Sequence, residues 1–150
     1  MQKIRTKNIP TLLCRLAVGL IFLSEGIQKY LFTDAGTGRF AKIGFSNPFF
    51  WAHFTGTCEI ICGILILIGL LTRLAAIPLL IIMIVAFITT KYPILVDKGF
   101  WAMAHEYRTD FAMTLLLIFL LIYGGGNYSA DKKISHSKTI QNETRNPSTQ

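Results

Sequence analysis

Charged residues are scarce in this chain of 150 residues. They make up 15% of the sequence against 52% apolar residues, and the mean hydropathy is +0.49. These values lie on the membrane side of ordinary globular composition. The formal net charge of +7 is not gathered in a basic stripe, because lysine and arginine occur in short segments between long apolar runs. The composition therefore argues against a nucleic-acid partner and predicts the lipid bilayer as the main surroundings of the chain.

Cysteine is also sparse, and the common catalytic motifs are missing. All three cysteines lie in apolar runs, and an odd number in such places is no disulfide framework. Cys58 and Cys62 do not have the C-x-x-C spacing of a redox motif, so we interpret them as packing residues. There is no phosphate-binding glycine loop, HExxH motif, cysteine-rich metal site or nucleophile elbow. The sequence thus predicts no metal site and no catalytic residue, and any reaction would take place within a helical bundle or on a partner.

Long apolar runs are what the chain has in abundance. A bilayer core of about 30 Å needs about 20 mostly apolar helical residues. Four segments meet that requirement, at about 9–30, 49–71, 74–92 and 106–124. Pro78 lies inside the third segment and predicts a kink, which membrane helices tolerate where neighbouring helices satisfy the freed backbone groups. Pro93 is expected to help end that segment.

The fold class predicted from these segments is all-α. It is an integral membrane four-helix bundle with short loops over residues 1–128, followed by a disordered polar C-terminal tail over 129–150. Lysine and arginine are slightly more numerous in the segments on the side of the N-terminus. Because basic loops stay inside, this distribution predicts that both termini are cytoplasmic.

Glu59 stands in one of the most apolar stretches of the chain, residues 55–73. Counting the helical rise from an outer edge near Phe50 places Glu59 close to the bilayer midplane. The same count from an inner edge near Ile9 places Arg15 within about 7 Å of that depth. We therefore predict that Arg15 pairs with Glu59. The pair is either a buried clasp that fixes helix register or a functional site, and both interpretations stay open.

One face of the first span is thin and polar. Arg15, Gly19, Gly26 and Lys29 recur on it at helical spacing. Glycines let a neighbouring helix approach closely, so Gly19 and Gly26 are predicted to be structural and their face to point into the bundle.

A second group of ionisable residues is predicted near the outer face. Glu25 precedes Lys29 by one helical turn, and Asp110 shares a face with Glu106 at the start of the fourth span. One interpretation is an outward-facing polar pocket formed by Glu25, Lys29, Glu59 and Asp110. The other is an interfacial network that anchors helix ends, which we favour for His105 and Arg108. A haem held by His53 and His105 is a further alternative, which no second histidine pair supports.

Four motifs together resemble the DoxX family of small four-helix membrane proteins. They are RLAVGLIFLSEGIQK (15–29), CEIICGILILIGLLTRLAA (58–76), HEYRTDF (105–111) and GGGNYSAD (124–131). The family pattern has an arginine, a glycine and a lysine along the first helix, a glutamate in the second and a threonine–arginine pair at the hairpin. The matching positions are Arg15, Gly19, Gly26, Lys29, Glu59, Thr72 and Arg73. Ala130 departs from the pattern, because leucine is common there.

The resemblance implies a multi-pass protein of the cell inner membrane. Some relatives look like subunits of redox systems that pass electrons to quinone or support oxidative-stress defence. We therefore predict a redox-associated subunit that binds quinone together with a redox partner protein. Because the chain has no evident electron carrier, this function requires such a partner or a bound cofactor. Glu59 would carry protons and Arg15 would tune it. The alternative is a non-enzymatic scaffold or a small-solute or proton transport protein, and whether the chain is an enzyme stays open.

Overall fold

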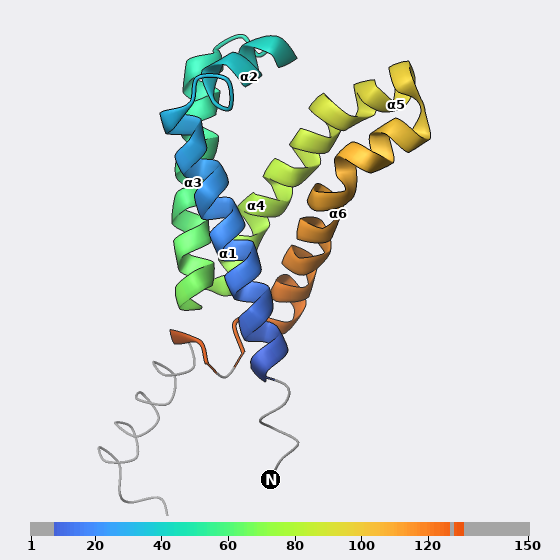
Figure 1. The fold of residues 1–150 in the computed structure, drawn as a ribbon. Coiled ribbons are helices and arrows are strands. Elements are labelled where there is room, and N and C mark those ends of the chain that lie inside the picture. Colours follow the sequence, from blue (N-terminus) through green and yellow to red (C-terminus); the bar gives the residue numbers. More distant parts are fainter. Residues whose placement is uncertain (1–7, 127, 131–150) are drawn as a thin grey trace, which may run out of the picture.

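The computed structural model describes residues 8–126 and 128–130, and within these ranges it is helical with no strand. The elements in chain order are α1 (Asn8–Leu31), α2 (Thr37–Ile43), α3 (Pro48–Ile68), α4 (Thr72–Ala86), the π-helix η2 (Phe87–Lys91), α5 (Tyr92–Lys98) and α6 (Phe100–Tyr123). Figure 1 shows two arms, α1 with α3 and α4 with α6, that lie close together near the α3–α4 turn and diverge toward the end that carries α2 and α5. Most of the predicted polar tail, from residue 131 onward, lies outside the described residues.

Among the described residues, three helical segments are long and apolar enough to cross a membrane. They are Ile9–Leu31, Pro48–Ile68 and Thr72–Lys98, and they contain the first three predicted spans almost entirely. The predicted fourth span, except for its last residue, lies within α6, whose first half carries Glu106, Arg108 and Asp110. The all-helical fold is thus confirmed, with three segments able to span a bilayer, while a fourth crossing by α6 stays a prediction.

The ends of α3 follow from local sequence. The Asn47 side chain accepts a hydrogen bond from the Phe50 backbone N–H at 3.3 Å, and Pro48 occupies the first turn, where no N–H is needed. The helix ends at Ile68, three residues before the predicted end at 71, because Gly69 adopts a left-handed conformation (φ 77°). This turn brings α4 back alongside α3.

The third membrane segment is longer than predicted. Pro78 lies inside α4 without ending it, and Pro93 does not end the segment, which continues to Lys98. Between the two prolines the backbone widens into η2, and Pro93 falls in the first turn of α5. A proline is tolerated there because its missing N–H is not required. The expectation that Pro93 helps end the segment is therefore wrong.

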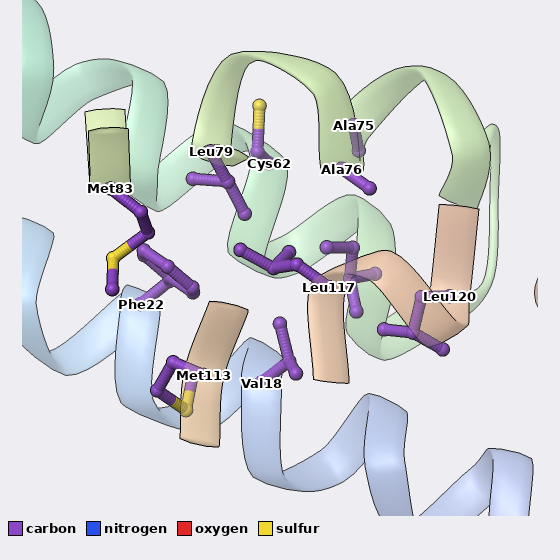
Figure 2. Packing of buried hydrophobic residues seen from close by; sticks show 11 residues of the cluster. Val18, Phe22, Cys62, Ala75, Ala76, Leu79, Met83, Met113, Leu117 and Leu120 are labelled. Atoms are coloured by element: carbon purple, nitrogen blue, oxygen red, sulfur yellow. The ribbon is translucent and has the colours of Figure 1, made fainter. Parts of the chain in front are cut away.

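The buried core fills the region where the two arms meet. Figure 2 shows this cluster, to which α1, α3, α4 and α6 all contribute: Val18, Phe22, Cys62, Ile66, Ala75, Ala76, Leu79, Met83, Met113, Leu117 and Leu120. Cys62 is 7% exposed and packs among apolar neighbours. Its position agrees with the interpretation as a packing residue. Because the core lies at the closed end, the diverging end is free to form a cavity.

Candidate functional site

A buried ion pair joins α1 to α3. Lys29 Nζ lies 2.5 Å from Glu59 Oε2, and the two side chains are only 9% and 4% exposed. Lys29 Nζ also lies 3.5 Å from the Glu25 carbonyl oxygen and 3.9 Å from Glu25 Oε2. A charged pair this deep in an apolar helix pair is tolerated because each charge neutralises the other. Lys29 is thus the partner that makes Glu59 acceptable in its apolar stretch.

The predicted pairing of Arg15 with Glu59 is wrong. Arg15 donates from Nε to the Ile66 carbonyl at 2.9 Å and from Nη2 to the Leu67 carbonyl at 2.6 Å. Its Nη1 donates at 3.1 Å each to the carbonyls of Gly125 and Tyr128. The physical reason is that the last carbonyls of a helix lack partners within it, and a guanidinium has several donors in a fixed fork. Arg15 therefore connects the end of α3 to the segment after α6, about 10 Å along α3 from Glu59.

A second ionic group lies on the other arm and was missed by the sequence reasoning. Lys91, the last residue of η2, is 9% exposed, and its Nζ lies 3.5 Å from Asp110 Oδ2 and 3.9 Å from Glu106 Oε2 of α6. From the sequence, Lys91 reads only as a basic residue at the outer end of a span. The ion pair could have been suspected because Lys91 and Asp110 lie at the same predicted membrane boundary. The helix face on which Lys91 lies could not be predicted, because a π-helix departs from the usual 3.6-residue spacing.

These two ionic groups line one cavity of about 600 Å³ between the diverging arms. The structure brings together in its lining all four residues of the predicted polar pocket: Glu25, Lys29, Glu59 and Asp110. It adds three charged residues that the prediction did not include: Arg39, Lys91 and Glu106. Several threonines also line it: Thr55, Thr89, Thr90 and Thr109. The volume falls within the usual range of small-molecule pockets, about 300–1,000 Å³.

The remainder of the cavity wall is apolar. Its side chains come from both arms and from the α2 region: Ile21, Phe22, Phe40, Ile43, Phe45, Trp51, Phe54, Ile81, Ile82, Met83, Val85, Ala86 and Met113. Ile21, Ile81 and Val85 are themselves 39–56% exposed, so the wall continues onto the outer surface of the helices. An apolar wall with a few charged groups suits an amphipathic ligand whose polar part meets the ionic groups.

The glycines predicted to be structural lie where α1 and α3 meet. A Cβ atom on Gly19 would come within 2.9 Å of the Gly63 carbonyl oxygen, and one on Gly26 within 2.7 Å of the Gly56 carbonyl oxygen. Contacts this short are not compatible with a side chain unless the backbones separate. The close approach is what brings the α1 and α3 charges within reach of each other.

The remaining predicted residues lie away from the cavity or at its edge. Arg73 donates from Nη2 to the Ile122 carbonyl at 2.9 Å, which connects the start of α4 to the end of α6. His105 Nε2 lies 3.1 Å from Arg108 Nη2 within α6. His53 Nδ1 lies 2.8 Å from the Phe49 carbonyl of its own helix, so each histidine contacts a neighbour on the same helix. These contacts give no support to a haem held between the two helices.

The described helices and this cavity define a small helical membrane protein, and comparison with known proteins gives the family. The chain belongs to the DoxX family, whose family model matches residues 11–92. It is 50% identical over 138 residues to an uncharacterized membrane protein of Mycobacterium tuberculosis, covering 87% of this chain and 85% of the relative. It is 35% identical over 84 residues to a Bacillus subtilis protein named "Putative oxidoreductase CatD", covering 56% of this chain and 61% of the relative. No solved structure matches the chain.

Proposed function

We propose that this DoxX-family protein is the membrane subunit of a redox system and binds a quinone in the cavity between its two arms. The observation that carries the proposal is the buried Lys29–Glu59 pair, with Nζ and Oε2 2.5 Å apart, on the wall of a largely apolar cavity of about 600 Å³. Ionisable groups inside a membrane are functional-site candidates by default. The name of the Bacillus relative, "Putative oxidoreductase CatD", supports the same direction.

The donor set of the cavity fits a quinone. A quinone has an apolar ring with carbonyl oxygens that accept hydrogen bonds, and it takes up two protons when it takes up two electrons. The Lys29 ammonium can donate to a carbonyl oxygen, and the aromatic rings of Trp51 and Phe54 offer apolar surface to the ring.

Proton supply is the role of the paired residues. The short contact between Lys29 and Glu59 allows a proton to be held between the ammonium and the carboxylate. Glu25 is 46% exposed and lies 3.9 Å from Lys29 Nζ, so it can exchange protons between the pair and water. The electrons come from a separate redox protein that carries a flavin, haem or iron–sulfur group.

The proposal includes four membrane crossings in the cell inner membrane, with both termini cytoplasmic. α6 supplies the fourth crossing. Its buried residues Met113, Leu117 and Leu120 pack into the core, while Leu115 and Ile118 on other faces are 51% and 40% exposed, as suits contact with lipid. In this orientation the cavity lies toward the outer side of the membrane.

The test is to identify quinones that co-purify with the protein in nanodiscs, by mass spectrometry. Wild type is compared with Glu59→Gln and with Asp97→Asn, a matched control at an exposed position of α5 outside the cavity lining. We expect quinone to be enriched with wild type and Asp97→Asn and lost from a Glu59→Gln variant that still unfolds cooperatively. If no sample carries quinone above the level of the surrounding lipid, the proposal is wrong.

The second candidate is a non-enzymatic scaffold or a small-solute or proton transport protein. The position of Lys29 and Glu59 in the α1–α3 interface favours the scaffold, because interhelical polar contacts stabilise membrane bundles by themselves. This function predicts that Glu59→Gln lowers the unfolding temperature in detergent while the quinone content of the preparations does not change.

A further inference from the structure

Lys91 differs from Lys29 in how its ammonium group is satisfied. Lys29 Nζ has a carboxylate oxygen at 2.5 Å, whereas the acidic oxygens nearest Lys91 Nζ lie at 3.5 and 3.9 Å. Within the described part of the chain, the ammonium of Lys91 makes ion pairs but no hydrogen bond of good geometry. Yet the residue is only 9% exposed and lines the cavity.

The Lys91 ammonium is open to the cavity, because its Nζ is not among the buried side-chain atoms that lack a hydrogen-bond partner. Its two ion pairs do not use all of its three N–H donors in hydrogen bonds to the protein. The carboxylates of Asp110 and Glu106 lie within 4 Å of the ammonium and offset its charge. They leave N–H donors free for an acceptor in the cavity.

The backbone that carries Lys91 is itself unusual. Lys91 ends η2, and single π-turns inside α-helices occur frequently at functional sites. Thr89 and Thr90, the two residues before it, donate their hydroxyls to the carbonyls of Val85 and Ala86 in the preceding turn, and within the described residues neither hydroxyl oxygen forms a hydrogen bond with the Lys91 ammonium. The donors of Lys91 therefore remain available to a ligand.

We propose that Lys91 is a second anchoring residue of the cavity, so that the ligand is held at two opposite edges. The Lys29–Glu59 pair on the α1–α3 arm binds one oxygen, and Lys91 on the α4–α6 arm donates a hydrogen bond to the other. This inference rests on the proposed quinone function and specifies its substrate class: a para-quinone, whose two carbonyl oxygens lie on opposite sides of one ring. A ligand with a single carbonyl can engage only one of the two walls.

The experiment uses the intrinsic fluorescence of Trp51, which lines the cavity. The other tryptophan, Trp101, is 84% exposed and is replaced in all samples by Trp101→Phe. Full-length protein in nanodiscs is titrated with a decyl para-naphthoquinone, which quenches the remaining tryptophan. The matching decyl tetralone, with one carbonyl, is measured by competition against the quinone.

The variants are Lys91→Met, Lys91→Arg and the matched control Lys98→Met, at an exposed lysine of α5 outside the lining. We expect Lys91→Met to weaken binding of the para-naphthoquinone about tenfold, the effect of one lost hydrogen bond to a charged donor, and to leave tetralone binding unchanged. Lys91→Arg, which keeps charge and donors, should restore most of the quinone affinity, and Lys98→Met should match the parent protein.

The outcomes distinguish a failure of the proposed role of Lys91 from a failure of the proposed quinone function. If Lys91→Met binds the quinone as tightly as the parent, or loses affinity for quinone and tetralone equally, Lys91 is no second anchor even though the cavity binds quinone. If the parent protein binds neither probe, the proposed function fails and this inference fails with it.

Discussion

The backbones of α1 and α3 meet at Gly26 and Gly56, where a Cβ atom on Gly26 would lie 2.7 Å from the Gly56 carbonyl oxygen. Lys29 lies one turn after Gly26, and Glu59 lies one turn after Gly56. The close contact of the two glycines therefore sets the distance at which Lys29 and Glu59 form their buried pair. Packing and electrostatics are coupled at this point of the bundle.

Replacing Gly26 by alanine should destabilise the protein by about 1–3 kcal/mol, because the new methyl group meets a backbone carbonyl that cannot move away independently of its helix. The measurement is the free energy of unfolding in detergent micelles. The control is Ala112→Val, which adds methyl groups at an exposed position of α6. Equal stability of Gly26→Ala and wild type would contradict the close helix contact.

A double-mutant cycle of Lys29→Met and Glu59→Gln should show a coupling of about 1–2 kcal/mol. Each single variant removes one charge of the pair and leaves the other charge buried without its partner, whereas the double variant removes both charges, so the two costs should not add. The cycle is measured by unfolding in the same micelles. Additive effects would mean that the two side chains do not interact in the bilayer-like environment.

Arg15→Lys should lower the free energy of unfolding by about 2 kcal/mol without changing quinone affinity. Lysine loses the fork that donates to the carbonyls of Ile66 and Leu67, but Arg15 does not line the cavity. Unfolding and Trp51 quenching are measured on the same preparations. Arg108→Lys, at an exposed arginine, serves as the control. A loss of quinone affinity with unchanged stability would instead support the role of Arg15 in tuning Glu59.

Thr72→Val should be neutral or should raise the free energy of unfolding by up to about 1 kcal/mol. The Thr72 hydroxyl is buried, and Oγ1 has no hydrogen-bond partner among the described residues. Removing an unsatisfied hydroxyl while keeping the side-chain shape removes a desolvation cost. Thermal unfolding of Thr72→Val and Thr72→Ser decides the matter, because a hydroxyl that stabilises the fold would make the serine variant the more stable of the two.

The sequence by itself determined the helical membrane character of the chain and identified the ionisable residues within its apolar runs. Apolar runs long enough to span a bilayer are a local property of the chain, so the first three spans could be located from length and hydropathy alone. An ionisable residue in such a run is visible without any structure, which is how Glu25, Lys29, Glu59 and Asp110 could be assigned to one pocket before their positions were known.

Only the tertiary structure decided which charges meet. The helical rise places Arg15 and Glu59 at similar depths in the bilayer. Depth alone does not give the rotation of each helix about its axis, and this rotation decides which side chains face each other. Arg15 instead donates hydrogen bonds to carbonyls at the end of α3, where Gly69 terminates the helix. Glu59 forms its ion pair with Lys29. Lys91 lines the cavity because it ends the π-helix η2, and no periodic sequence pattern predicts a π-helix. Partner choice depends on helix rotation, close approach and local winding, and these quantities are set by packing between segments distant in the chain.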